Sequence, residues 1–306
     1  MMGLLALSVG CGDCTGGKGK IARGETEGVT VGSVTDFLAR QASTPPDLQS
    51  FLLIGEEDEA NRFPFTVAVY ALAPPGQPRY RGCAGVLLTR QLVLTAGQCV
   101  CRPHKDGGPG SGETTRIDTS SCAATAAVVT ATYEPLENRK GVESWSVEYR
   151  GTVRVHPQFE LRMDAAGAIT GDHADLAVVR LDTPVQPNIE PVRLADGIAQ
   201  AGERLTVVGH GYIDPTDGLD GRRRFTHDTV SQLLDPDGAR VQFGSPELFS
   251  YKGDTGGPCL RETAQGLELL GISNRGSGKP PAFTSTYVYR EWLANELHLA
   301  ASESPP

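Results

Sequence analysis

Val93-Leu94-Thr95-Ala96-Gly97-Gln98-Cys99 joins a short aliphatic run to a turn of small residues, and Gly253-Asp254-Thr255-Gly256-Gly257-Pro258 forms a second Gly-rich turn far along the chain. Around them, runs rich in Val, Ile, Leu and Thr recur between turn signals, in a sequence with 37 glycines and 21 prolines. Short apolar runs between turns are typical of an all-β protein. The runs are residues 65–71, 85–88, 92–94, 152–155, 176–181, 205–208 and 267–272.

One helix is expected, at the end of the chain. Its apolar positions share one face and its charged positions share the other, which is the pattern of a helix that covers a core. The apolar stripe should pack against the strands. The apolar face consists of Tyr289, Trp292, Leu293 and Leu297, and the charged side of Arg290, Glu291 and Glu296.

Several blocks of the sequence, in order, resemble the chymotrypsin-like (trypsin-fold) serine proteases. Each block alone is a common motif, but all of them in register identify the family. The blocks are Leu52-Leu53-Ile54-Gly55-Glu56-Glu57 with Arg62-Phe63-Pro64, Cys83-Ala84-Gly85-Val86-Leu87-Leu88, Val93 to Cys99, Asp175-Leu176-Ala177-Val178-Val179-Arg180-Leu181, Val207-Val208-Gly209-His210-Gly211, Gly253 to Pro258, and residues 281–297.

The resemblance implies two antiparallel six-stranded β-barrels followed by a C-terminal α-helix. Residues 52–188 would form the first barrel, and residues 189–300 the second barrel with the helix. Residues 52–300 would then be one trypsin-like domain. Function has to be argued from the site, because one fold hosts many activities.

In this family a hydroxyl attacks the peptide carbonyl, a base takes its proton and a carboxylate orients the base. By position in the matching blocks, Asp175 is the carboxylate, whereas the base position holds Gln98 and the nucleophile position holds Thr255. An amide does not titrate near neutral pH, so Gln98 cannot shuttle a proton. Thr255 keeps a hydroxyl, but its β-branched side chain is stiff and its methyl group crowds the path of attack.

Two histidines lie near these positions in the sequence and could replace the base. His173 precedes Asp175 by two residues, and His104 follows Gln98 by six. Either histidine would have to come within hydrogen-bonding reach of Thr255.

The resemblance also implies roles for the residues around the nucleophile position. The amides of Gly253 and Thr255 would form the oxyanion hole, and Asp254 would pair with the amine of Leu52 after cleavage before that residue. The preceding Gln49-Ser50-Phe51 holds no Lys or Arg for a tryptic activator. If Leu52 stays in the chain, a zymogen-like loop is expected, because burying the Asp254 carboxylate unpaired is costly.

The specificity pocket departs from the trypsin-like pattern. Phe249 occupies the floor, where trypsin-like members carry an acidic residue, so a basic substrate side chain has no counter-ion. Asn274-Arg275-Gly276 replaces the edge that pairs with a substrate strand. Phe249 either fills the pocket, which we favour, or gives it an apolar preference.

Seven cysteines are present. Cys83 and Cys99 have the disulfide spacing of the family. Cys101 and Cys122 bracket a Gly-rich insertion, residues 102–121, and a bridge there would close a loop that otherwise costs entropy to order. Cys259 is expected in a buried strand as a free thiol.

The beginning of the chain is expected to be a signal peptide, residues 1–11, followed by a polar tether or pro-segment, residues 12–51. Gly10-Cys11 after a short apolar run resembles a bacterial lipoprotein site with lipidation of Cys11. A plain secretory signal or a mis-assigned start is the alternative. The remaining six cysteines suit an oxidising compartment, so an extracytoplasmic location is expected, secreted or lipid-anchored in a bacterial envelope.

Charge and composition exclude several other classes. A formal net charge of -9 argues against nucleic-acid binding. Glu56-Glu57-Asp58-Glu59 lacks the spacing of a calcium loop, and Arg222-Arg223-Arg224 lies in a Gly- and Asp-rich stretch, so we expect both runs to be solvated surface. The histidines are scattered, with no Cys/His cluster, so no metal site and no cofactor are expected.

Three functional hypotheses remain. The leading one is a catalytically inactive homologue that serves as an extracytoplasmic scaffold and binds a protein partner through its barrel loops. The first alternative is a weak serine-type endopeptidase that hydrolyses peptide bonds through Thr255. The second is a decoy that binds protease inhibitors without turnover. A membrane contact would come only through a lipid anchor at Cys11.

Overall fold

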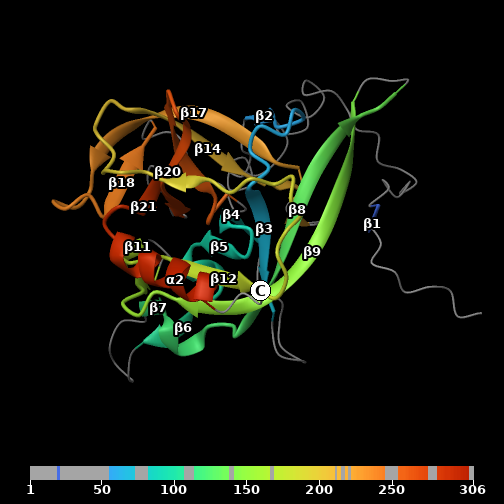
Figure 1. Ribbon diagram of the computed structural model, residues 1–306. Helices are drawn as coiled ribbons and strands as arrows, with labels where there is room; N and C mark the ends of the chain where they lie inside the picture. The colour runs from blue at the N-terminus through green and yellow to red at the C-terminus, as the bar shows by residue number, and fades with distance from the viewer. Residues whose placement is uncertain are drawn as a thin grey trace, which may run out of the picture.

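The computed structural model describes residues 19–20, 55–72, 82–106, 114–137, 141–165, 169–210, 212–214, 218–219, 222–244, 254–274 and 281–302. Strands dominate these ranges, and one α-helix lies at their C-terminal end (Figure 1). No helix in them is long and apolar enough to cross a membrane.

Six antiparallel strands close the first barrel, because the sheet that starts at β3 returns to it through β8. Around the ring β3 pairs with β4, β4 with β5, β5 with β12, β12 with β9, and β9 with β8. The strands are β3 (Thr66–Ala71), β4 (Cys83–Thr89), β5 (Leu92–Thr95), β8 (Thr125–Pro135), β9 (Val142–Val155) and β12 (Ala177–Leu181), and β1 (Gly19–Lys20) adds to β9.

The second barrel closes in the same way, since β20 pairs with both β19 and β21. Two short strands add to its outside, β13 on β20 and β2 on β17. The strands are β14 (Arg204–Gly209), β17 (Arg224–Leu233), β18 (Arg240–Phe243), β19 (Pro258–Thr263), β20 (Gly266–Asn274), β21 (Ala282–Ser285), β13 (Arg193–Leu194) and β2 (Glu56–Glu57), with a separate hairpin of β15 (Tyr212–Asp214) and β16 (Gly218–Leu219).

A four-stranded sheet, in the order β11-β10-β7-β6, is separate from the two barrel sheets in its hydrogen bonding, but its Ile117 and Leu161 are buried in the same hydrophobic core as residues of the first barrel. The insertion expected as a Gly-rich loop contributes two of its strands and a 3-10 turn, so that expectation was incomplete. The elements are β6 (His104–Asp106), β7 (Thr114–Asp118), β10 (Glu160–Met163), β11 (Ile169–His173) and the 3-10 turn Thr119–Ser121.

The C-terminal helix α2 (Arg290–Ser302) buries Leu293 and Ala300 against the core, as its apolar stripe predicts. Glu296 was expected on the charged outer side, but only 3% of its surface is exposed. Its carboxylate lies 3.1 Å from the Arg154 guanidinium of β9. The predicted all-β fold, with two six-stranded barrels and a C-terminal helix, is confirmed.

The two barrels meet at a fully buried guanidinium. Arg223, which is 0% exposed, donates from Nε to Asp58 Oδ2 at 2.7 Å and from Nη1 to the Ala131 carbonyl at 2.9 Å. The same carboxylate accepts the backbone amides of Arg62 and Phe63 at 2.7 and 2.9 Å. Arg223 precedes β17 of the second barrel and Ala131 lies in β8 of the first, so this ion pair joins the barrels to the segment that carries Asp58.

The prediction of solvated charge runs is therefore wrong for the buried Asp58 and Arg223, although Glu56 and Glu59 are exposed as expected. Asp58 and Arg223 pair in the interior, and Glu57 on β2 forms ion pairs with Arg222 and Arg224 on either side of Arg223. The acidic run and the arginine run are two halves of one contact, far apart in the sequence.

Arg223→Met should lower the free energy of unfolding by about 3–5 kcal/mol, because removing one partner leaves a buried charge uncompensated. Urea denaturation measures the loss. Arg150→Met is the matched control, since it breaks the exposed contact to Glu148 at 3.4 Å, and it should cost under about 1 kcal/mol. Equal losses in the two variants would contradict the role of the junction.

Candidate active site

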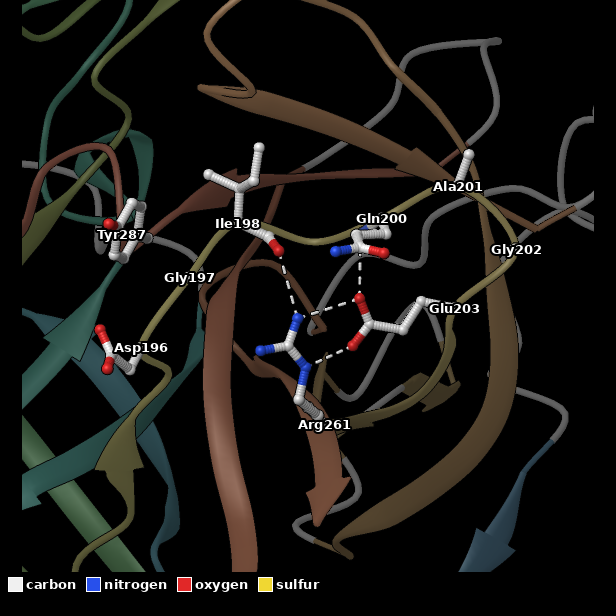
Figure 2. Close-up of a pocket in the computed structure, with 9 residues that line it drawn as sticks. All are labelled: Asp196, Gly197, Ile198, Gln200, Ala201, Gly202, Glu203, Arg261 and Tyr287. Carbon is white, nitrogen blue, oxygen red and sulfur yellow. Dashed lines mark hydrogen bonds and ion pairs between the residues drawn. The ribbon is translucent and has the colours of Figure 1, made fainter.

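An open hollow of about 770 Å³ on the second barrel contains none of the expected site residues (Figure 2). Its polar groups already bind one another. Arg261 Nη2 donates to Glu203 Oε2 at 3.0 Å and to the Ile198 carbonyl at 3.2 Å, and the backbone N–H of Gln200 donates to the same carboxylate oxygen. These polar groups are thus already used in contacts within the second barrel, so the candidate site is sought elsewhere.

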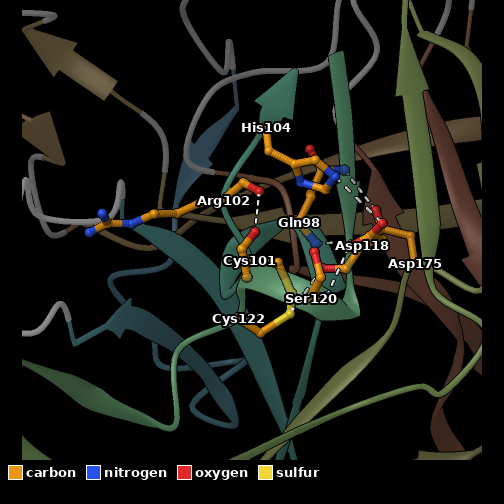
Figure 3. Close-up of a disulfide and its surroundings, with 9 residues drawn as sticks. Gln98, Cys101, Arg102, His104, Asp118, Ser120, Cys122 and Asp175 are labelled. Carbon is orange, nitrogen blue, oxygen red and sulfur yellow. Dashed lines mark hydrogen bonds and ion pairs between the residues drawn. A yellow bond between two sulfur atoms is a disulfide. The ribbon is translucent and has the colours of Figure 1, made fainter. Parts of the chain in front are cut away.

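The structure brings Gln98 and Asp175 together, although 77 residues separate them (Figure 3). Gln98 Nε2 donates to Asp175 Oδ2 at 2.7 Å, and its backbone N–H donates to Oδ1 at 2.9 Å. Asp175 is 0% exposed. Both oxygens of the buried carboxylate are thus satisfied by the residue at the base position.

Local backbone constraints position this pair. Gln98 lies in the 3-10 turn Gly97–Cys99 directly after β5, and a Cβ on Gly97 would come within 2.8 Å of the Phe159 ring, so only glycine fits. On the other side, Ala174 has a positive φ of 48°, and its amide donates to the Tyr289 hydroxyl at 3.1 Å. Non-glycine residues in this conformation are strained and need surrounding contacts to hold them.

Thr255 lies in the turn before β19, in the second barrel, and is tied to the first. Its carbonyl accepts the Ala84 amide at 2.9 Å, and its surface is only 5% exposed. The next residue, Gly256, has φ +87°, and a Cβ there would lie 2.2 Å from the Ala84 oxygen. In the described ranges no hydrogen bond links the Thr255 hydroxyl to Gln98 or to a histidine.

The two candidate replacement histidines are engaged elsewhere. His104 lies on β6, which pairs with β7 in the four-stranded sheet, and its Nε2 is 3.7 Å from Asp118 Oδ2. His173 is exposed at the end of β11, with its ring centroid 6.3 Å from that of Tyr289. Neither supplies the missing base in this arrangement.

A second carboxylate, Asp172, lies beside the pair and was missed by the sequence reasoning. Asn274 Nδ2 donates to Asp172 Oδ2 at 2.8 Å and to Thr284 Oγ1 at 2.9 Å. The role of Asn274 at the edge of a specificity pocket stays a prediction. Burial, and then the charge of Asp175, raises the pKa of Asp172 to about 7. The only signal in the sequence was its position three residues before Asp175.

Burial also raises the pKa of Asp175 to about 6, against the opposing hydrogen bonds from Gln98. A carboxylate in the interior is disfavoured in its charged form unless hydrogen bonds or a cation compensate. Among the described residues, the groups that donate to the Asp175 carboxylate are amides. The site is therefore an Asp175 carboxylate paired with the Gln98 amide, with a second carboxyl, Asp172, beside it. The Gln98 amide does not titrate near neutral pH, so it cannot relay a proton from Thr255 to Asp175.

Both expected disulfides are present. Cys83–Cys99 and Cys101–Cys122 have sulfur–sulfur distances of 2.05 and 2.00 Å, and the second lies near Gln98 (Figure 3). Cys259 is a free, buried thiol. Such bonds persist in oxidising compartments.

Of the other expected site residues, Asp254 is described and six are not. Asp254 is 2% exposed and packs against Gly209, where an added Cβ would lie 1.9 Å from Asp254 Oδ1. The roles assigned to Asp254 and to the Thr255 amide remain predictions. Gly253, Leu52, Phe249, Arg275, Gly276 and Cys11 lie outside the described residues. The part of the chain that is described holds no cluster of three or more His, Cys, Asp or Glu that could bind a metal.

A family model described as Trypsin matches residues 53–293. The chain belongs to the trypsin family. Serine protease 56 of Homo sapiens is 26% identical over 255 residues, which is 75% of this chain and 36% of that protein. Phenoloxidase-activating factor 3 of Holotrichia diomphalia is 23% identical over 81% of this chain and 73% of its own length.

A third relative of this trypsin-family chain matches along nearly all of its own length. Beta-fibrinogenase mucrofibrase-3 of Protobothrops mucrosquamatus is 24% identical over 87% of this chain and 94% of that protein. By contrast, the chain spans only about a third of the length of serine protease 56. These similarities extend along the barrels and establish a serine protease homologue.

Asp175→Asn should stabilise the protein more at pH 7 than at pH 4. Because burial raises the pKa of Asp175 to about 6, the folded state retains a proton that the unfolded state releases near pH 4. The stability contributed by Asp175 is therefore present below about pH 4 and lost as the pH rises to about 6. The asparagine mimics the protonated acid, and Gln98 can rotate its amide to match it.

Urea denaturation of wild type and variant across this range gives the test. The difference in unfolding free energy should change by on the order of 2 kcal/mol between pH 4 and pH 7, at about 1.4 kcal/mol per pKa unit. The exposed Asp182→Asn serves as control and should show a flat difference. A flat difference for Asp175→Asn as well would contradict the assignment.

Proposed function

We propose that this serine protease homologue is catalytically inactive and acts as an extracytoplasmic scaffold that binds a protein partner. The observation that carries the proposal is the 2.7 Å hydrogen bond from Gln98 Nε2 to Asp175. In an active triad the same carboxylate orients a histidine that takes and returns a proton. Here it orients an amide, which keeps the geometry and lacks the chemistry.

The rate that a triad loses without its base favours complete loss of turnover over slow catalysis. In a related triad, loss of the base lowers turnover by roughly 10⁶, leaving about 10³ to 10⁴ over water from binding and the oxyanion hole. Catalysis by Thr255 would be limited to this residual rate enhancement, and its methyl group would hinder attack by the hydroxyl. Its 5% exposure further limits access.

The alternative of a weak serine-type endopeptidase has one observation in its favour, since Thr255 keeps a hydroxyl in the turn that follows the family pattern. No described histidine reaches it. A proton acceptor would then have to come from a partner chain or from the substrate. We therefore rank this alternative below the scaffold.

Two features support binding outside the cytosol. The two disulfides favour an oxidising compartment. Both barrels are retained although Gln98 stands at the base position, as a protein that binds without turnover would require. A lipid anchor at Cys11 in a bacterial envelope belongs to this proposal as its finer form. Intact mass and N-terminal sequencing of the native protein test the anchor and cleavage before Leu52 together.

The hypothesis that the protein is catalytically inactive is tested by labelling with a fluorophosphonate probe, which reacts with an activated hydroxyl. Wild type should remain unlabelled, both intact and after engineered cleavage before Leu52. Gln98→His combined with Thr255→Ser should gain labelling after that cleavage, because it restores base and nucleophile beside Asp175. Adding Asp175→Ala to the restored variant should abolish the gain.

Labelling of the wild type that disappears in Thr255→Ala would overturn the hypothesis of catalytic inactivity and support that of a weak endopeptidase. Calorimetry with a panel of protease inhibitors separates the decoy from the scaffold. Tight inhibitor binding to the unlabelled wild type would assign the protein to the decoy class, whereas a scaffold for another partner should bind none of them.

A further inference from the structure

The strand β9 is longer than the barrel needs. It has 14 residues, and β8 pairs with it from residue 142 to residue 152. On its other edge, β12 pairs only with residues 151–155, and the Asp182 amide then bonds to the Arg150 carbonyl at 2.8 Å. Residues 142–149 therefore form an edge outside the barrel ladder, in the hairpin that projects from the body (Figure 1).

An open strand edge is a template for another extended chain, because its backbone groups lack a ladder partner. In the described ranges one strand uses this edge. Gly19 pairs with Ser146 and Lys20 with Trp145, in antiparallel register. The occupant comes from the polar segment that precedes the barrels.

The surroundings of the edge suit an added strand. A hollow of about 410 Å³ opens beside it, lined by Trp145, Ser146 and Val147 from β9, two threonines of β8 and the loop 186–188. In strand addition the backbone gives affinity, and pockets beside the edge take alternate side chains. Apolar Ile21 directly follows the paired Lys20 in the sequence.

Charge is complementary between the two segments. Residues 15–24 carry Lys18, Lys20 and Arg23 and no acidic residue. Residues 131–149 carry four glutamates against Arg139 and Lys140. Opposite net charge favours antiparallel pairing of these two stretches over pairing of either with a copy of itself.

We propose that the edge of β9 formed by residues 142–149 is a strand-addition site whose occupant is the chain's own N-terminal segment, residues 15–24. The segment is thereby bound to the first barrel by its backbone, and it stays bound when the chain is cut before Leu52. This inference does not depend on whether Thr255 is active.

A disulfide trap in the full chain tests the register. Cys11 and Cys14 are replaced by serine, Gly19→Cys and Ser146→Cys are introduced, and a protease site is inserted between residues 40 and 46. Mild oxidation should link the two cysteines, so that the N-terminal piece remains attached after cleavage until reductant is added. Gly19→Cys with Ser231→Cys, an exposed serine on β17, is the matched control and should link at least about tenfold more slowly.

Hydrogen exchange gives a second readout, measured on the chain that carries the inserted protease site but not the introduced cysteines at positions 19 and 146. Backbone amides of residues 142–149 should exchange at least about tenfold more slowly in the intact chain than after the N-terminal piece is cut off and removed. Protection should not change with protein concentration. Equal linking of the two cysteine pairs, unchanged exchange after removal, or protection that vanishes on dilution, as for a second copy at this edge, would each overturn the proposal.

Discussion

The buried guanidinium of Arg223 is the contact on which the arrangement of the two barrels depends. It binds Asp58 on the segment before the first barrel and the Ala131 carbonyl within that barrel, from a position at the start of a second-barrel strand. Desolvating such a pair is costly unless every donor and acceptor is used. The Asp58 carboxylate meets that condition through two further backbone amides. The relative placement of the first barrel, whose β5 leads into Gln98, and the second, whose β19 follows Thr255, thus depends on a contact that involves neither residue.

The same requirement of full satisfaction explains how the catalytic positions could change without loss of the fold. Asp175 is buried, and a buried carboxylate needs hydrogen-bond donors. Gln98 supplies two, one from its backbone and one from its side chain. A glutamine at the base position therefore replaces a histidine structurally toward Asp175, and the loss of turnover that we propose follows because an amide cannot take a proton from Thr255. Burial and the charge of Asp175 raise the pKa of the neighbouring Asp172 to about 7, and Asn274 donates a hydrogen bond to this second carboxyl.

Much of the fold could be predicted from the sequence, because ordered blocks such as Asp175 to Leu181 carry both a strand and its place in the barrel. The Cys83–Cys99 disulfide followed for the same reason, whereas Cys101–Cys122 was predicted because the two cysteines bracket an insertion. The charge runs could not be read correctly, since the exposure of Asp58 and Arg223 depends on a pairing across 165 residues. Asp172 was missed because its importance comes from a neighbour on β20, Asn274, and not from local pattern. Strands β6 and β7 lay within a Gly-rich stretch whose composition resembled a loop.

The central claim is that the chain performs no turnover, because the group held by Asp175 cannot take a proton. The most direct measurement is hydrolysis of a diverse peptide library by the purified chain, cleaved before Leu52, beside Thr255→Ala prepared identically. The account predicts that the two rates are indistinguishable from each other and from buffer. A wild-type rate above buffer that Thr255→Ala abolishes would contradict it.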